Sequence, residues 1–277
     1  MGFRINTNIS SISAQRSLNV NNREAEGNLA KLSSGSRITK AADDAAGLAI
    51  SEKLKANIRS LKQADRNAND GISMVQTAEG GLNEVSSILT RMRELAIQTS
   101  SDTVGDVERG MTNMEYQNLK LELERISQVT EFNGKKLLNG EGGMLEFQIG
   151  ANNDGFQDRI AYDASQVNAG MGALGVSELD VSTKEGSQSS LASIDSAIEK
   201  VSGSRAFLGA IQNRLTSTSN NLQINVENLS AANSRIRDVD YADATATKAK
   251  NDILNAAGTS VLAQANMSGQ NALKLIG

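Results

Sequence analysis

The chain contains no proline, cysteine, histidine or tryptophan in its 277 residues. Ordinary proline usage near 5% predicts about 14 prolines at this length, and proline is the residue that most reliably interrupts a helix. Cysteine and histidine are the usual zinc ligands, and they supply the thiolate and imidazole of many active sites. Their absence excludes disulfides, zinc sites of the usual ligand types and most catalytic chemistry. The absence of proline permits long uninterrupted helices.

Aromatic residues are also scarce, and neither sign of charge is in large excess. Phe, Trp and Tyr make up 3% of the chain, and 28 basic and 32 acidic residues are interspersed to give a net charge of -4. No polybasic block is present that would attract a phosphate backbone or an anionic lipid surface. We therefore expect no nucleic-acid partner and no membrane partner.

The N-terminal residues 1–8 lack the apolar core of a signal peptide, and no window approaches the ~20 apolar residues of a transmembrane span. The protein is therefore expected either to stay in the cytoplasm or to leave the cell without a cleaved signal.

Apolar residues in the first hundred positions predict two helices. The first series is Ile5, Ile9, Ile12, Leu18, Ala25, Leu29 and Leu32. It describes an amphipathic helix that ends at the Ser/Gly-rich residues 33–37. A second series from Leu54 to Ala96 averages close to 3.5 residues per step, which is typical of a coiled-coil seam. Gly71 lies inside this second helix, over about 44–99, and indicates the close approach of another helix.

The middle of the chain changes character. Residues 100–106 read as a turn, and a third helix follows with Met111, Met114, Leu119, Leu123, Ile126 and Val129 expected to face inward. Apolar residues on both sides of the Asn/Asp/Gly-rich residues 152–155 predict a β-hairpin near 147–162.

Helical periodicity then returns from Leu191 to Leu229, and a last apolar series runs from Ile253 to Ile276. The order is nearly mirror-symmetric, so the expected fold is mostly α. Both chain ends would form long antiparallel coiled-coil helices, with one small β-hairpin in the middle. The outer faces of the end helices gain free energy only if something covers them, and neighbouring copies are the natural cover.

Several long motifs then resemble one family. They are LAKLSSG at 29–35, KAADDAAGLAI at 40–50, RNANDGIS at 66–73, LGAIQNR at 208–214, SRIRDVDY at 234–241 and GTSVLAQAN at 258–266. In this order they resemble bacterial flagellins along nearly the whole chain.

The resemblance implies a structural subunit without a cofactor that polymerises into the extracellular flagellar filament used for swimming. It implies an inner terminal coiled-coil domain of 1–43 and 236–277 and an outer helical domain of 44–235, a minimal form without large variable domains. Packing of the inner domain and polymerisation would depend on apolar residues of both ends: Ile5, Ile9, Ile12, Leu29, Leu32, Val261, Leu262, Leu273 and Ile276.

The resemblance also implies partners. They are further copies of the chain, the flagellar cap and hook–filament junction proteins, and an export chaperone that engages the apolar C-terminal residues during type III export. Arg91, Leu95 and Glu115 match the flagellin residues that bind the host Toll-like receptor. The alternative role for this patch is packing against the next subunit, and both roles are compatible.

Three other functions remain as alternatives. A hook–filament junction adaptor would share the flagellin-like ends, although the match through RNANDGIS and LGAIQNR argues for flagellin. A secreted enzyme would need a catalytic insert, and metalloprotease inserts need paired histidines. A cytoplasmic coiled-coil scaffold would never be found outside intact cells. The acidic pair Asp43 and Asp44 is interpreted as solvated or intersubunit polar contacts.

Overall fold

The computed structural model describes residues 7–274. They form two compact units, one drawn from the described parts of 1–56 and 228–277 and the other from 57–227. The elements follow in the order α1 (Ile9–Ser34), α2 (Ala45–Thr99), α3 (Asp106–Val129), β1 (Glu131–Phe132), β2 (Lys135–Lys136), β3 (Met144–Gln148), β4 (Arg159–Asp163), the 3-10 turn η1 (Ala164–Val167), α4 (Met171–Leu174), α5 (Lys184–Arg237) and α6 (Tyr241–Lys274).

Long helices dominate, as the missing proline predicts. α2 has 55 residues and α5 has 54. The expected mostly α fold with a small hairpin is confirmed, and so is the order of its helices. Within residues 7–274, no helix combines the length and the apolar character that a membrane-spanning segment requires.

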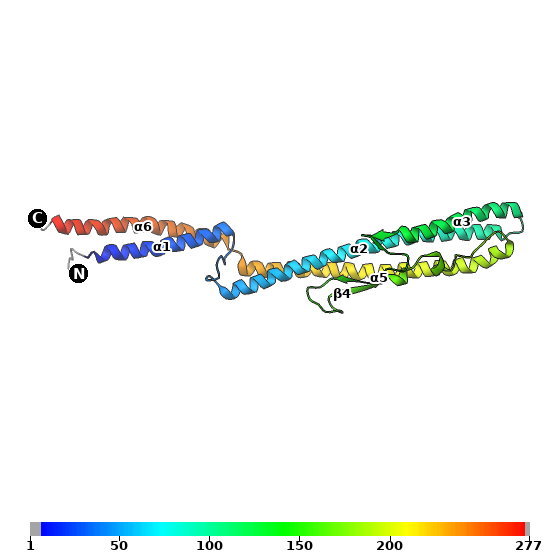
Figure 1. The fold of residues 1–277 in the computed structure, drawn as a ribbon. Helices are drawn as coiled ribbons and strands as arrows, with labels where there is room; N and C mark the ends of the chain where they lie inside the picture. Colours follow the sequence, from blue (N-terminus) through cyan, green and yellow to red (C-terminus); the bar gives the residue numbers. More distant parts are fainter. Residues whose placement is uncertain (1–6, 275–277) are drawn as a thin grey trace. The chain divides into compact units, whose positions relative to one another are not determined.

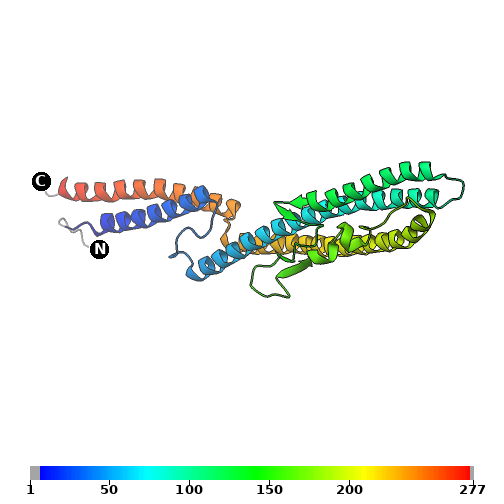
Figure 2. The same cartoon turned by 45° about the vertical axis from the view of Figure 1, so that its right-hand side comes forward.

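In the first unit, α1 and α6 lie side by side (Figures 1 and 2). α1 begins after Asn8, whose side-chain oxygen accepts a hydrogen bond from the backbone N–H of Ser11 over 3.1 Å. It ends at Gly35, which has a φ of 67° in the left-handed region that favours glycine. The predicted helix end at 33–37 is therefore confirmed.

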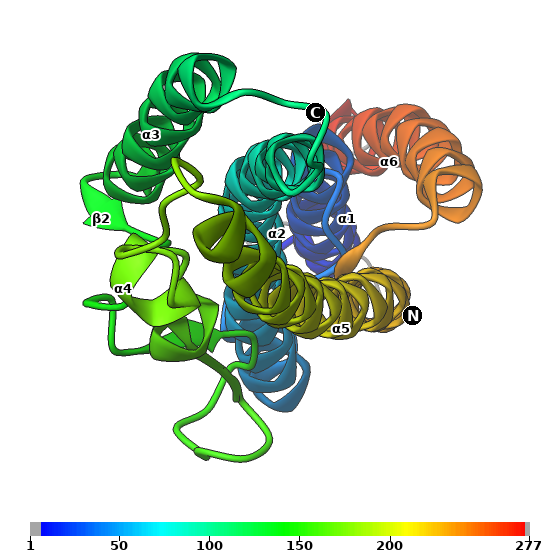
Figure 3. The same ribbon diagram turned by 90° about the vertical axis from the view of Figure 1, so that its right-hand side faces the viewer.

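In the second unit, α3 and α5 flank α2 when the helices are viewed end-on (Figure 3). α5 runs antiparallel to α2, because Ser219 donates to Asp65 over 2.5 Å and Arg93 donates to Asp195 over 2.6 Å. The predicted coiled-coil seam of α2 is buried or half-buried throughout. Its most enclosed side chains pack with those of α5, and this shared core contains Val75, Leu82, Val85, Leu89 and Met92 of α2 and Ile194, Val201, Leu208 and Leu215 of α5.

The predicted hairpin is formed by β3 and β4, which pair antiparallel with Phe147 opposite Ile160. The two strands stop short of the connecting loop, because β3 ends before Ile149 and β4 begins after Phe156. The side chain of Phe156 is 94% exposed. A second hairpin, β1–β2, turns at Asn133 and Gly134. Both turn residues have positive φ, at 49° and 77°, as a two-residue type I′ turn requires.

The β1–β2 hairpin is absent from the sequence prediction, although Asn-Gly is the strongest short signal for such a turn. The close approach predicted at Gly71 is confirmed. A β-carbon at this position would lie 3.0 Å from Cδ1 of Phe147 on β3 and 3.2 Å from Cδ1 of Leu215 on α5. The glycine therefore lets both the hairpin and α5 approach the α2 backbone.

Candidate assembly surface

The contact face of α1 is a coiled-coil seam of small and polar residues. Its half-buried side chains recur at steps of three and four residues: Ser11, Ala14, Leu18, Asn21, Ala25, Asn28 and Leu32. This spacing averages 3.5 residues and keeps one face of a helix against a partner. Leucine occupies two of the seven positions, and no described side chain of α1 is fully buried. The α1–α6 seam therefore buries little apolar surface.

Asparagine side chains bridge this seam. Asn21 donates from Nδ2 to the carbonyl oxygen of Asn251 over 3.0 Å and to the side-chain oxygen of Asn255 over 2.6 Å. Asn28 donates from Nδ2 to the carbonyl oxygen of Ala244 over 2.8 Å. Contacts later in α1 therefore meet earlier residues of α6, so the two helices are antiparallel.

Two further contacts lie near the start of α1. Asn8 donates from Nδ2 to the carbonyl oxygen of Ala265 over 2.9 Å, and Ser11 donates from Oγ to Oδ1 of Asn266 over 2.8 Å. The sequence prediction contains none of these bridging residues. Asn21 and Asn28 are one heptad apart, and that spacing is the signal that could have identified them.

The apolar side chains of α1 and α6 are mostly exposed. At 100° per residue, Ile9, Ile12 and Val20 fall on the α1 face away from the seam. On α6, Ile253 and Met267 fall on the corresponding outer face, and Leu254 and Val261 border the seam. All of them are largely open to solvent in one copy, and so is Leu29.

The predicted packing residues thus divide between two faces. Ile9, Ile12, Leu29 and Val261 are exposed, whereas Leu32 and Leu262 are half-buried in the seam. Ile5 and Ile276 lie outside the described residues, and Leu273 is described only as part of the backbone of α6.

Arg37 lies in the connection between α1 and α2 and is hydrogen-bonded to the end of α5. It donates from Nη2 to the carbonyl oxygen of Ile236 over 2.7 Å. Its backbone N–H donates to the carbonyl oxygen of Arg237 over 2.6 Å. The side chain of Arg237 in turn pairs with Glu52. Within the first unit, these contacts join the α1–α2 connection and the start of α2 to the end of α5.

The acidic pair at the start of α2 caps the backbone. Asp43 accepts hydrogen bonds from the backbone N–H groups of Lys40 and Thr39, which lower the pKa of its carboxyl group. Asp44 accepts from the backbone N–H of Gly47 over 2.8 Å, at the first turn of α2. Both carboxylates therefore stabilise the turn before α2. In the part of the chain that the structure describes, no group of three or more acidic side chains is placed to hold a metal ion.

The predicted receptor patch is only partly on the surface. Arg91 donates from Nε and Nη2 to one carboxylate oxygen of Glu115, over 2.9 and 2.8 Å, and from Nη1 to Glu94. These hydrogen bonds, that to Glu115 foremost, raise the pKa of the Arg91 guanidinium. Leu95 is 2% exposed and belongs to the core. The structure therefore brings Arg91 and Glu115 together across α2 and α3 and encloses Leu95 beneath the surface.

The predicted orientation of α3 is partly wrong. Met111, Met114 and Val129, expected inward, are exposed, and with Val107 and Leu121 they form an apolar stripe on one face. Leu123 is buried as expected, and Leu119 and Ile126 pack against the core.

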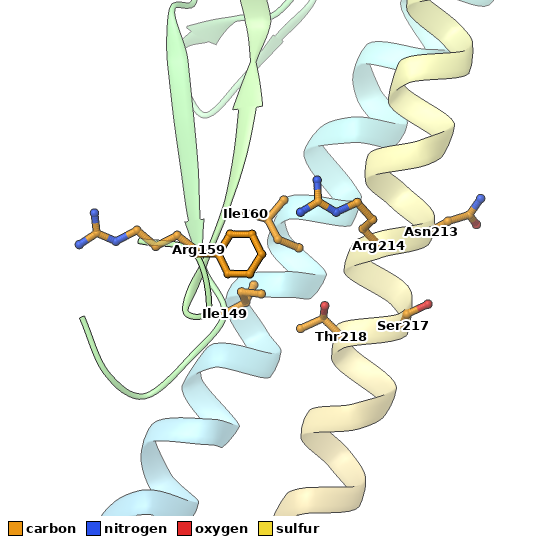
Figure 4. Close-up of a pocket in the computed structure, with 8 residues that line it drawn as sticks. Ile149, Arg159, Ile160, Asn213, Arg214, Ser217 and Thr218 are labelled. Carbon is orange, nitrogen blue, oxygen red and sulfur yellow. The ribbon is translucent and has the colours of Figure 1, made fainter. Parts of the chain in front are cut away.

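A groove of about 420 Å³ lies between the β3–β4 hairpin and α5 (Figure 4). Ile149, Arg159 and Ile160 border it from the hairpin, and Asn213, Arg214, Ser217 and Thr218 border it from α5. Arg159 is held by Glu146 over 3.0 Å. The polar lining residues are two arginines, one asparagine and two hydroxyl residues, with no carboxylate among them, so the groove lacks the paired carboxyl groups that often serve as general acid and base.

Comparison with known proteins points to one family. The family model of the bacterial flagellin N-terminal helical region matches residues 5–142, and that of the bacterial flagellin C-terminal helical region matches residues 191–276. Together the two matched regions span well over half of the sequence and include both end helices.

Individual relatives agree over nearly the full length. The flagellin of Halalkalibacterium halodurans is 44% identical over 98% of this chain and 99% of its own. A flagellar filament 30.7 kDa core protein of Treponema maltophilum is 40% identical over the same shares. The crystal structure of Bacillus cereus flagellin superposes with a TM-score of 0.51 and 28% identity, covering 57% of this chain and 88% of that one.

Proposed function

Because the chain belongs to the bacterial flagellin family, we propose that the outward apolar faces of α1 and α6 make the contacts by which its copies polymerise. The family is structural, and the chain is a subunit of the extracellular flagellar filament that drives swimming. The proposal concerns which residues carry this assembly.

The observation that carries the proposal is the unused apolar face of α1. Ile9, Ile12 and Val20 lie away from α6 and stay exposed in a single copy. Full burial of each such side chain contributes roughly 1.5–3 kcal/mol. Three exposed side chains on one short helix face therefore favour association, and polymerisation supplies copies of the same chain as partners.

The residues predicted from the sequence enter this proposal in two roles. Ile9, Ile12, Leu29 and Val261 would be covered by neighbouring copies, whereas Leu32 and Leu262 would support the seam inside one copy. We further propose that 1–43 with 236–277 act as the inner terminal domain of the filament and 44–235 as its outer domain. Breaks in the helices at 35–44 and 238–240 support these boundaries.

More specific partners belong to the same proposal. The flagellar cap and hook–filament junction proteins would contact subunits at the two ends of the filament. An export chaperone would engage the apolar C-terminal residues Leu262, Leu273, Leu275 and Ile276 before assembly, and of these Leu262 has a described side chain, which is half-buried. A host Toll-like receptor would contact Arg91 and Glu115, which are exposed, while Leu95 would support them from within.

The alternative functions fit less well. A junction adaptor and a cytoplasmic scaffold are both disfavoured by relatives that are flagellins and filament core proteins over their full length. The proposal assigns the chain no catalytic activity of its own.

The test is growth of filaments from seeds by purified full-length monomer. Ile12→Ser together with Val20→Ser removes two outward apolar side chains and leaves the seam intact. We expect the critical monomer concentration to rise at least about tenfold, because each tenfold step corresponds to about 1.4 kcal/mol.

Asn19→Ser is the matched control, since Asn19 is exposed on the same stretch of α1 and is polar already. It should leave the critical concentration unchanged. Growth of the double variant at the concentration of the unaltered protein would refute the assignment of this face.

A further inference from the structure

The apolar content of the α1–α6 seam is too small to fix its own register. On α1 the two seam leucines, Leu18 and Leu32, are separated by Asn21, Ala25 and Asn28, so a shift by one heptad would exchange one set of small side chains for another. In coiled coils, a polar residue in the seam selects one register at a cost in stability. The seam of this pair contains such residues.

Asn21 has a side-chain partner in one register alone. Its Nδ2 group donates both protons, one to the side-chain oxygen of Asn255 at 2.6 Å and one to the carbonyl oxygen of Asn251 at 3.0 Å. A shift of α6 by seven residues would place Leu262 or Lys248 where Asn255 stands. Neither side chain carries an amide oxygen, so the Asn21–Asn255 bond would be lost and its polar group left half-buried.

Leu18 restricts the register by shape, one turn away from Asn21. It packs on Gly258, where an added β-carbon would lie 2.8 Å from Cδ2 of Leu18 and 3.0 Å from its Cγ. The same seven-residue shifts would bring Asn251 or Ala265 to this level. Both residues have a β-carbon, so Leu18 would have to move in either shifted register.

We propose that Asn21 with Asn255, and Leu18 with Gly258, specify the antiparallel register of the α1–α6 pair at the expense of its stability. The inference deepens the proposed function and rests on it, because the register determines which outward residues stand at the same level. The contacts of Asn8 with Ala265 and of Asn21 with Asn251 place Ile12 near the level of Val261.

The chain has no cysteine, so introduced pairs report the register without background. Ala14→Cys with Leu262→Cys joins two seam positions that lie one turn beyond Leu18 and Gly258. Ala14→Cys with Gly269→Cys joins positions that meet only after a one-heptad shift. Oxidised filaments are dissolved in denaturant and run on a non-reducing gel. A chain with an internal disulfide then migrates as a monomer, whereas a disulfide between chains gives a dimer.

In otherwise unaltered filaments, we expect the 14–262 disulfide within each chain and no 14–269 disulfide. Asn21→Leu with Asn255→Leu should reduce the 14–262 disulfide at least twofold and produce the 14–269 disulfide. The temperature at which these filaments dissociate should not fall, because leucine adds apolar contact to the seam. Asn19→Leu with Asn22→Leu, two exposed positions on the same turns, should change neither disulfide. A double-leucine variant with the 14–262 disulfide alone would overturn the proposal.

Charge substitution gives a second test that does not depend on assembly of the leucine variant. Asn21→Asp and Asn255→Lys should each lower the yield of the 14–262 disulfide. The two substitutions together should restore the yield, because the introduced charges pair across the seam. Absence of this rescue would also overturn the proposal. Failure of the proposed function looks different, because Ile12→Ser with Val20→Ser would then leave growth normal whatever the register.

Discussion

Arg109 closes the turn between α2 and α3 by donating a hydrogen bond from Nε to the carbonyl oxygen of Thr99 over 3.0 Å. Its Nη2 donates to the carbonyl oxygen of Ser101 over 2.9 Å, and its Nη1 pairs with Asp106 over 3.0 Å. The side chain is buried, so it satisfies carbonyl groups that the end of α2 would otherwise leave unpaired.

Replacement of this side chain should therefore destabilise the outer helices. Arg109→Met removes all three contacts and leaves the Thr99 carbonyl enclosed without a donor, and an unsatisfied buried polar group costs about 1–3 kcal/mol. We expect the free energy of unfolding to fall by about 2–3 kcal/mol. Urea denaturation of the monomeric chain, followed by circular dichroism, measures the difference.

Arg125 offers a matched control, because it pairs with Glu122 three residues earlier on α3 just as Arg109 pairs with Asp106. Its pair is exposed on both sides, and such pairs contribute from zero to about 1 kcal/mol. Arg125→Met should therefore leave the midpoint nearly unchanged. Equal losses for the two variants would show that the carbonyl contacts of Arg109 contribute nothing.

Two glycines of α2 should respond to alanine in opposite directions. At Gly80 no atom lies within 4 Å of an added β-carbon, so Gly80→Ala should stabilise the helix by about 0.5–1 kcal/mol. At Gly71 the new methyl group would press on Phe147 and Leu215, and crowding a packed core typically costs about 1–3 kcal/mol. We expect a net loss for Gly71→Ala in thermal unfolding. A gain equal to that of Gly80→Ala would mean that the hairpin yields without strain.

The long helices could be predicted because their apolar residues recur with a regular period and no proline interrupts them. The orientation of α3 could not. Met111 and Met114 lie on one face and Leu119 and Leu123 on another, so the helix carries two apolar faces and periodicity alone does not select the buried one.

The polar seam escaped prediction for a different reason. A search for apolar periodicity ignores asparagine, although Asn21 and Asn28 occupy seam positions as regularly as Leu18 does. Arg109 was missed because two of its three partners are the backbone carbonyl groups of Thr99 and Ser101, which no side-chain pattern reveals. The candidate assembly residues were therefore found as a set of apolar residues, and the structure divides them between seam and outer face.

Lys120 should hold the segment between η1 and α5 against α3. Its Nζ donates to the carbonyl oxygens of Ser177 and Leu179, over 2.6 and 3.0 Å. Burial lowers the pKa of this ammonium group. Lys120→Met removes both contacts, so we expect at least tenfold faster amide hydrogen exchange at residues 176–181, while the α2 and α5 amides keep their rates.

Lys200 is the matched control for this variant. It also donates from Nζ to a carbonyl oxygen, that of Ala173 over 2.9 Å, but in an exposed setting where water can replace it. Lys200→Met should therefore change exchange in the same segment little. Unchanged exchange in Lys120→Met would show that the segment is held by its apolar contacts alone.

Tyr162 should make the second unit sensitive to alkaline pH. Burial, helped by the negative charge of Asp163, raises the pKa of its phenol to about 12 from the ordinary value near 10. The ring packs between Phe147 and Phe207, with centroids 6.4 and 6.1 Å away. Between these two pKa values the unfolded chain releases the proton and the folded chain retains it, so ionisation favours unfolding.

The stabilisation by neutral Tyr162 is therefore complete below about pH 10 and is lost as the pH rises toward about 12, with a slope of at most about 1.4 kcal/mol per pH unit. Tyr162→Phe should reduce this slope, whereas the contribution of Tyr116, whose pKa burial also raises to about 12, should remain. The substitution of Tyr162 should cost little near neutrality, because no described residue hydrogen-bonds to the hydroxyl group. Tyr241→Phe, at an exposed position, should leave the slope as it is. Urea unfolding measured at a series of alkaline pH values, together with tyrosinate absorbance, gives both quantities. An identical slope in Tyr162→Phe and the unaltered chain would mean that another group controls alkaline unfolding.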